Sequence, residues 1–196
     1  AEPAVFAGPA ADEDIDIFFY GHGREYRERW IDAMLVQPSE RLPRVRFAVR
    51  GTRLGTPARI AALPYASFNA LKGYCRRSRI NILITRQAHA SVYASSTARP
   101  FELAAIGSAM VSNPYLGIEE WFEPGREVLI VHNADEAVAT YRELLSDGAA
   151  RRDLASRARE RLLAEHTYAH RARYLRTLLS GEARETPHIV SAAASE

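Results

Sequence analysis

The sequence predicts an α/β fold in which helices cover both faces of a parallel, doubly wound sheet. Short apolar runs bounded by turn residues alternate along the chain with segments of helical periodicity. The last third of the chain is helical throughout. Its 196 residues, 47% of them hydrophobic and 26% charged, are enough for one domain with a substantial core. We therefore expect one α/β domain that ends in C-terminal helices.

Five apolar runs predict the strands of this sheet. The first, residues 15–20 (IDIFFY), is continuous and ends at glycines, as expected of a parallel strand that is buried on both faces. The others are expected at residues 45–49, 80–85, 109–112 and 128–132. Because helical segments separate these runs, right-handed crossovers would join them into a Rossmann-like sheet of about five strands.

Helical periodicity predicts the elements between and after the strands. The segments are residues 24–36, 67–79, 99–106, 118–122, 134–145, 149–165 and 168–179. Three regions follow from this pattern: a linker at residues 1–13, one domain at residues 14–180, and a flexible tail at residues 181–196.

Composition and charge exclude several classes of protein. A net charge of +2 gives no phosphate-tracking surface, so we expect no nucleic-acid partner. Cys75 is the only cysteine, which excludes an internal disulfide and favours a reducing compartment. We expect a buried structural thiol there. No apolar run reaches the roughly 20 residues of a membrane helix. The expectation is a cytoplasmic protein without a membrane span.

Ligands of doubly wound sheets bind at the carboxyl ends of the strands, and the first such junction is Gly21-His22-Gly23-Arg24. Gly21 and Gly23 allow close approach of the backbone, and Arg24 adds a positive charge at the start of a helix. A tight turn alone needs the same glycines. Contact with a phosphate or sugar and a purely structural turn therefore both remain open.

The second junction precedes the helix at residues 99–106 and carries most of the candidates. Free amides and three hydroxyls, followed by Arg99, would cradle a diphosphate; the hydroxyl residues are Ser95, Ser96 and Thr97. The same hydroxyls would supply a helix N-cap, with Pro100 in the first turn. Glu102 either complements the helix dipole or accepts hydrogen bonds from the vicinal hydroxyls of a ribose. Local sequence does not decide between these interpretations.

Three further features are weaker candidates. Arg86 follows the third predicted strand and would add charge near a base or phosphate. Glu119 opens a short helix after residues 109–112, where it either faces the donor or complements the helix dipole. His166 and His170 lie four apart, but no carboxylate or cysteine partner stands at suitable spacing. We expect no metal site.

Several segments, taken in order, resemble the CgeB-like and group 1 glycosyltransferases of the GT-B type. Residues 99–111 (RPFELAAIGSAMV) are similar to the stretch R-P-F-E-x-x-A-x-G-x-x-x-V. Residues 117–127 (GIEEWFEPGRE) resemble G-(I/L)-E-x-x-F-x-P-G-x-E. Residues 134–137 (ADEA) and 166–171 (HTYAHR) are similar to the motifs D-x-x-E-L and H-T-Y-x-x-R that come next. The likeness runs from about residue 14 to residue 179.

The resemblance implies the second, donor-binding half of a GT-B fold. Such a domain binds a nucleotide-diphosphate sugar and serves transfer of a hexosyl-type sugar to an acceptor, without a metal or other cofactor. By the resemblance, Glu102 binds the ribose and residues 95–97 form the phosphate-binding loop. Retaining GT-B enzymes carry another glutamate eight positions earlier, where this chain has Ala94, so the stereochemical outcome stays open. The resemblance also implies a partner, the N-terminal acceptor domain, which this chain lacks.

Two other classes remain as alternatives. A non-catalytic nucleotide-binding or protein-interaction module, derived from a glycosyltransferase, is favoured by Ala94 and by the missing partner domain. A dinucleotide binder is the weaker alternative, because Gly21-His22-Gly23 lacks the third glycine of that fingerprint. Arg50-Gly51 also stands where an acidic residue would end the second strand.

Overall fold

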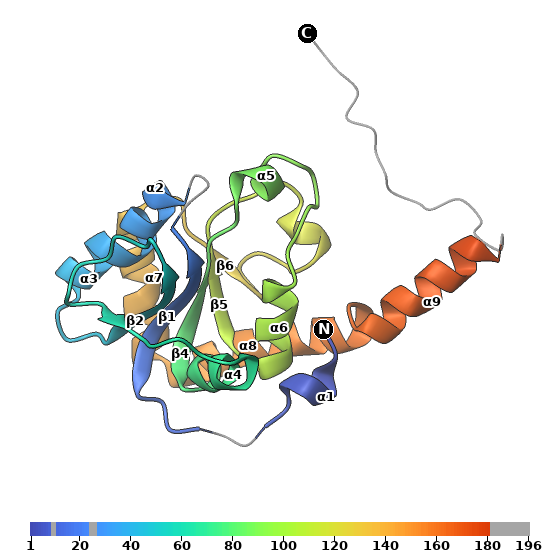
Figure 1. Cartoon of the computed structure of the whole chain (residues 1–196), viewed down its shortest axis with the longest axis horizontal. Coiled ribbons are helices and arrows are strands. Elements are labelled where there is room, and N and C mark those ends of the chain that lie inside the picture. The colour runs from blue at the N-terminus through green and yellow to red at the C-terminus, as the bar shows by residue number, and fades with distance from the viewer. Residues whose placement is uncertain (9–10, 24–26, 181–196) are drawn as a thin grey trace, which may run out of the picture.

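A parallel sheet of six strands forms the centre of the molecule within residues 1–8, 11–23 and 27–180, the part that the computed structural model describes (Figure 1). Its strands are β1 (Ile15–His22), β2 (Phe47–Thr52), β3 (Ala61–Ala62), β4 (Ser78–Leu83), β5 (Ala109–Ser112) and β6 (Leu129–Ile130). They lie in the order β3-β2-β1-β4-β5-β6, and every pair is parallel. The strand order therefore reverses between β1 and β4, and the predicted α/β, doubly wound class is confirmed.

The five predicted strands are all present, and β3 is the sixth. It is only two residues long and both its side chains are exposed, so no apolar run marks it. β1 continues two residues beyond the predicted end, because Gly21 and His22 pair with Gly51 and Thr52 of β2. The predicted helix at residues 118–122 is a short 3₁₀ helix, η2 (Ile118–Glu120).

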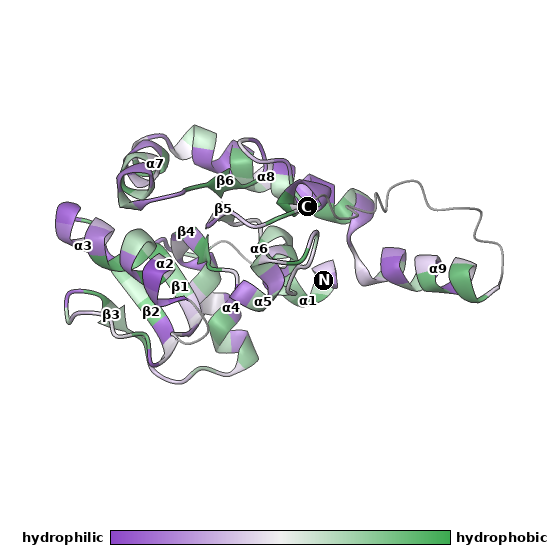
Figure 2. Ribbon diagram, turned by 90° about the horizontal axis from the view of Figure 1, so that it is seen from above, coloured by the Kyte–Doolittle hydropathy of each residue, from purple (hydrophilic) through white to green (hydrophobic). Residues whose placement is uncertain are grey.

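Two helical layers bury the two faces of the sheet. One layer holds α2 (Glu28–Ile31), the π-helical η1 (Asp32–Val36), α3 (Gln37–Arg41) and α7 (Ala134–Ser146). The other holds α4 (Phe68–Arg76) and α6 (Arg99–Ile106), and α8 (Gly148–Glu165) contributes side chains to both cores. Figure 2 shows the two layers on opposite sides of the strands. In β1, Ile17 and Phe19 join the first core and Phe18 the second, as expected of a strand buried on both faces.

Residues 1–8, expected as part of a linker, pack against the domain instead. They contain the helical turn α1 (Pro3–Phe6), and the side chain of Phe6 is 6% exposed. Lys72 Nζ donates to the carbonyl of Val5 at 2.7 Å, and Arg76 donates to the carbonyls of Phe6 and Ala7 at 2.6 Å each. The aromatic side chain and these hydrogen bonds fix the segment to α4, which composition alone does not reveal.

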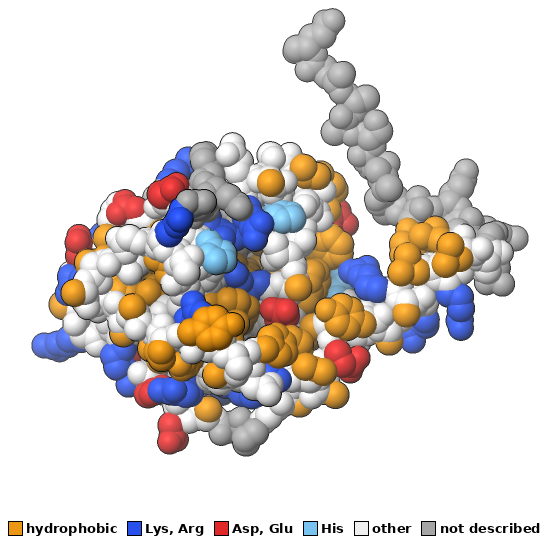
Figure 3. Space-filling view, in the orientation of Figure 1, with side chains coloured by type: hydrophobic (Ala, Val, Ile, Leu, Met, Phe, Trp, Pro, Cys, Tyr) orange, Lys and Arg blue, Asp and Glu red, His pale blue; other side chains and the backbone are white. Residues whose placement is uncertain are grey.

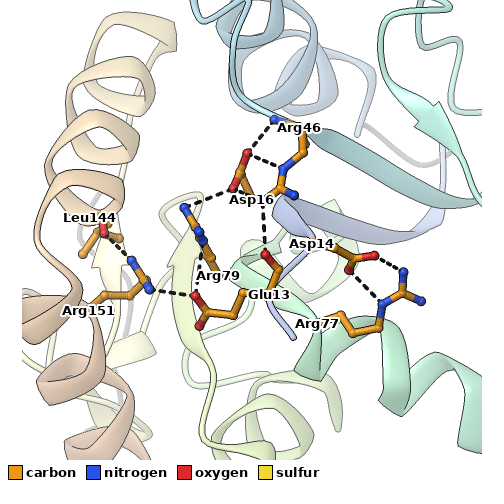
Figure 4. A network of polar contacts seen from close by, with 8 residues as sticks. All are labelled: Glu13, Asp14, Asp16, Arg46, Arg77, Arg79, Leu144 and Arg151. Carbon is orange, nitrogen blue, oxygen red and sulfur yellow. Dashed lines mark hydrogen bonds and ion pairs between the residues drawn. The ribbon is translucent and has the colours of Figure 1, made fainter. Parts of the chain in front are cut away.

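The amino edge of the sheet carries a network of arginines and carboxylates (Figure 4). Asp16 of β1 accepts hydrogen bonds from the backbone amide and the guanidinium of Arg46, at 2.8 to 3.1 Å. Arg79 pairs with Glu13 and Asp16 at 3.2 and 3.4 Å. Arg151 donates to Glu13 at 3.0 Å and to the carbonyl of Leu144 at 2.9 Å. The arginines here tie α8 and the loop before β2 to the start of β1.

The C-terminal helix α9 (Tyr168–Leu179) projects from the domain (Figure 1). Its base is fixed by a capping box between Thr167 and His170. His166 is buried against the rings of Phe101 and Trp121, and this burial lowers the pKa of His166 to about 4. Residues 181–196, predicted as a tail, lie outside the described residues. No helix in the described ranges has the length and apolar character needed to cross a membrane.

Candidate functional site

A pocket lies at the carboxyl ends of β1 and β4, where the strand order reverses. Its volume is about 210 Å³. The loops after β1, β4 and β5 and the start of α6 supply the side chains that line it: Tyr20, Arg27, Thr85, Arg86, Ser96, Thr97, Arg99, Glu102 and Tyr115. In Figure 3 basic side chains gather over the region between β1 and α6, next to an acidic one. The pocket therefore occupies the position at which doubly wound sheets bind their ligands.

The turn before α6 contributes hydroxyls and backbone amides. Ser96 and Thr97 line the pocket. Among the described residues, no group accepts a hydrogen bond from the amides of Ser96, Thr97 and Ala98. The helix N-cap is Ala98, which makes no side-chain cap, so the expectation that a Ser or Thr caps this helix is wrong. Because the hydroxyls do not cap the helix, they and the amides stay available to a ligand.

Ser95, predicted with its two neighbours, does not line the pocket. Its hydroxyl hydrogen-bonds Nδ1 of His89 at 2.7 Å and so holds the turn against α5 (Gln87–Ala90). Glu119 also lies outside the pocket and is exposed. The structure therefore brings together Ser96 and Thr97 but separates Ser95 and Glu119 from them.

Glu102 and Tyr20 face each other across the pocket wall. Glu102 lies in the first turn of α6, and its carboxylate Oε2 accepts a hydrogen bond from the Tyr20 hydroxyl at 3.4 Å. Burial raises the pKa of Tyr20, an effect that the nearby Arg99 partly opposes. The phenol is therefore a proton donor over the whole physiological range. Glu102 keeps its second oxygen for a ligand.

Arg99 lies over aromatic rings and has no carboxylate partner among the residues that the structure describes. Its guanidinium carbon is 4.1 Å from the centroid of the Tyr20 ring and 5.7 Å from that of Phe19. Its Nε is buried without a hydrogen-bond partner. A Cβ at Gly21 would come 3.1 Å from the Phe19 ring and 3.4 Å from the Arg99 guanidinium, so glycine leaves room for the charge beside the strand end.

Gly23 has a structural reason that sequence alone could not separate from ligand binding. A Cβ at Gly23 would lie 1.7 Å from the carbonyl oxygen of Arg53, and one at Gly51 would lie 1.7 Å from that of Gly21. The Gly23 amide also donates to the Thr52 carbonyl at 3.0 Å. Close packing between the loops after β1 and β2 therefore accounts for Gly23, and it does not line the pocket.

Arginines from two further loops reach the pocket. Arg86 follows β4 and lines it, as predicted for its position. Arg24 lies outside the described residues. Arg27, three positions later, is buried and lines the pocket; it donates to the carbonyl of Ile84 at 3.1 Å and to that of His22 at 3.2 Å. Sequence analysis missed Arg27 because it lies in a segment predicted as an ordinary amphipathic helix. Its arginine type at a strand-to-helix junction was the available signal.

Ala94 stands in a tight contact between two loops. Its φ is +53°, its amide donates to the Leu116 carbonyl at 2.9 Å, and its carbonyl accepts from Trp121 Nε1 at 3.0 Å. A Cβ at Gly117 would lie 2.3 Å from the Ala94 nitrogen. The backbone at this position is thus engaged on both sides. Sequence analysis did not foresee these contacts.

Comparisons with known proteins define first a class and then a family. The sheet order and the switch-point pocket are those of α/β domains that bind nucleotides. The chain belongs to the glycosyl transferase-like family, whose sequence profile matches residues 24–177. No curated protein sequence matches the chain.

Solved structures with the same fold include glycosyltransferases. The chain is similar to sucrose-phosphate synthase from Thermosynechococcus elongatus (TM-score 0.71, 17% identity), covering 92% of this chain and 51% of that one. It is similar to T4 phage BGT in complex with UDP-glucose (TM-score 0.70, 14% identity; 88% and 50% covered). It also resembles the C-terminal domain of a glycosyl transferase group 1 family protein (LpcC) from Francisella tularensis (TM-score 0.64, 12% identity; 85% and 98% covered). The chain spans about half the length of the first two.

Proposed function

We propose that the chain is the donor-binding half of a GT-B glycosyltransferase and that the switch-point pocket binds a nucleotide-diphosphate sugar. The observation that carries the proposal is the placement of Arg99 and Glu102 in one pocket, on either side of Tyr20. Glu102 accepts hydrogen bonds from the ribose hydroxyls. Arg99, Arg86 and the amides of the turn before α6 face the diphosphate and stabilise it as a leaving group. T4 phage BGT, a structural neighbour, binds UDP-glucose.

The size of the pocket supports a site that two domains share. At about 210 Å³ it is smaller than the roughly 300–1,000 Å³ typical of small-molecule sites, so it encloses only part of a nucleotide sugar. We propose that an N-terminal acceptor domain, of the kind that accounts for the greater length of the structural neighbours, completes the site. Transfer of a hexosyl-type sugar, the CgeB-like relationship and a cytoplasmic location belong to the same proposal, and the sequence motifs at residues 99–111 and 117–127 support it.

The test measures thermal unfolding with UDP, GDP and ADP and their sugar conjugates. A ligand at a hundred times its Kd adds about 2.7 kcal/mol of stability, which raises Tm by about 5 to 10 °C in a domain of this size. Glu102→Gln should weaken binding about tenfold, because an amide replaces the acceptor of the ribose hydroxyls. Glu160→Gln, on the surface of α8, is the matched control. Unmoved melting curves with every nucleotide would contradict the proposal.

A non-catalytic nucleotide-binding module is the second candidate, favoured by Ala94 in place of the glutamate that retaining enzymes carry. The two candidates share the pocket and differ in turnover. Nucleotide binding measured by calorimetry, beside release of free nucleotide from the bound sugar conjugate, separates them. Binding without release, in the presence of the partner domain, favours the module.

A further inference from the structure

Tyr20 joins the two parts of the pocket that carry opposite charge. Its hydroxyl donates to Glu102 at 3.4 Å, and its ring lies 4.1 Å from the guanidinium carbon of Arg99. Glu102 belongs to the first turn of α6 and Arg99 to its first residue, whereas Tyr20 comes from β1. One strand residue thus contacts both charged groups of a helix that starts on the far side of the pocket.

The position of the Tyr20 ring is itself fixed by the sheet. Phe18, two residues earlier on the same face, stacks on it with a centroid separation of 6.0 Å and an interplanar angle of 23°. Phe18 is fully buried in the core beneath. Arg50 is the register partner of Tyr20 on β2, so the ring stands between a neighbouring strand and α6. A rigid ring on a central strand is a better support for a ligand-binding charge than a loop side chain.

We propose that Tyr20 is a positioning residue that makes this site selective for ribonucleotides. This inference rests on the proposed function. The hydroxyl holds one oxygen of Glu102, so that the other oxygen and the remaining lone pairs meet the vicinal hydroxyls of a ribose. The ring holds the Arg99 guanidinium by a cation–π contact, so that its N–H groups are directed at the diphosphate. The hydroxyl and the ring therefore have separable effects on two parts of one ligand.

Two variants separate these effects. Tyr20→Phe removes the hydroxyl and keeps the ring, whereas Tyr20→Leu removes both. Tyr74→Phe, a hydroxyl deletion on α4 outside the pocket lining, is the matched control. The probes are UDP, dideoxy-UDP, which lacks both vicinal hydroxyls, and inorganic pyrophosphate, which has no ribose. The dissociation constant of each is measured by calorimetry on protein whose melting curve shows it to be folded.

The expected pattern differs between the variants. Tyr20→Phe raises the Kd of UDP about threefold, in keeping with the long hydrogen bond, and leaves those of dideoxy-UDP and pyrophosphate unchanged. Tyr20→Leu also raises the Kd of pyrophosphate severalfold, because Arg99 loses its aromatic support. An equal change for UDP and dideoxy-UDP in Tyr20→Phe overturns the inference, since a merely structural role moves both together. If wild-type protein binds neither UDP nor pyrophosphate, the proposed function fails as well.

Discussion

The two edges of the sheet carry pockets of similar size and opposite character. The pocket at the amino edge has a volume of about 230 Å³ and the one at the carboxyl edge about 210 Å³, and arginines line both. At the amino edge Arg79 and Arg151 pair with Glu13, and Arg76 donates to two backbone carbonyls. At the carboxyl edge Arg99 lies over aromatic rings with no described carboxylate as partner. The same residue type therefore does different work at each edge.

The difference shows where binding capacity is kept. A guanidinium that is already paired with carboxylates or carbonyls has few donors left, so the amino-edge arginines act as internal cross-links. An arginine supported by aromatic faces keeps its N–H groups for a ligand. The location of a pocket and the presence of arginine are thus insufficient to identify a site. The partners that the protein already supplies decide it.

The largest expected effect is on stability, at the amino edge. Asp16→Ala should lower the free energy of unfolding by about 2 to 3 kcal/mol, because Arg46 and Arg79 lose a buried acceptor. Nucleotide affinity of the folded protein should not change. Urea denaturation at pH 7 measures the first quantity and calorimetry the second, with Asp153→Ala on the surface of α8 as control. A loss below about 0.5 kcal/mol would place Asp16 among ordinary surface charges.

The same variant has a pH signature. Burial alone would raise the pKa of Asp16, but hydrogen bonds and positive charge from Arg46, with Arg79 nearby, outweigh it and hold the pKa below its ordinary value. A carboxyl whose folded pKa is depressed stabilises the fold above its unfolded pKa of about 4. This contribution is lost as the pH falls further. Between roughly pH 4 and pH 2, the wild type should therefore lose more stability than Asp16→Ala does.

Arg99→Ala should show the reverse pattern at the carboxyl edge. The Kd of a nucleoside diphosphate should rise about tenfold, or about 1.4 kcal/mol, through loss of a charge-assisted contact. The free energy of unfolding should fall by less than about 1 kcal/mol, since only cation–π contacts are lost. Arg46→Ala is the matched control, with lower stability and unchanged affinity. If both variants alter the same quantity, the contrast between the two edges is wrong.

The sequence predicts the fold well because long apolar runs dictate it. Residues 15–20 and 80–85 form the central strands where continuous burial leaves no alternative to a two-sided sheet. What it could not give depends on single side chains. β3 has no apolar pattern, and the attachment of residues 1–8 depends on Phe6 and on hydrogen bonds to backbone carbonyls.

The candidate site was predictable in its location and only partly in its members. Strand ends and glycines mark the junctions, so Glu102, Arg99 and Arg86 were found from sequence. Distance along the chain does not tell which way a side chain points, and Ser95 turns to His89 instead of the pocket. Tyr20 was hidden because an aromatic residue at the end of an apolar run is typical of a core.

The smallest expected effect sets the scale for the arginines of the two edges. Arg157 pairs with Asp153 on the surface of α8 at 2.8 Å, with side chains 40% and 59% exposed. Such i,i+4 pairs contribute about 0.3 to 0.5 kcal/mol, so Arg157→Ala should change the free energy of unfolding by no more than that and leave nucleotide affinity unaltered. Urea denaturation in low and high salt measures it, since screening should abolish the difference. A larger, salt-insensitive loss would mean that arginine substitutions destabilise this domain wherever they fall, and the amino edge would lose its special character.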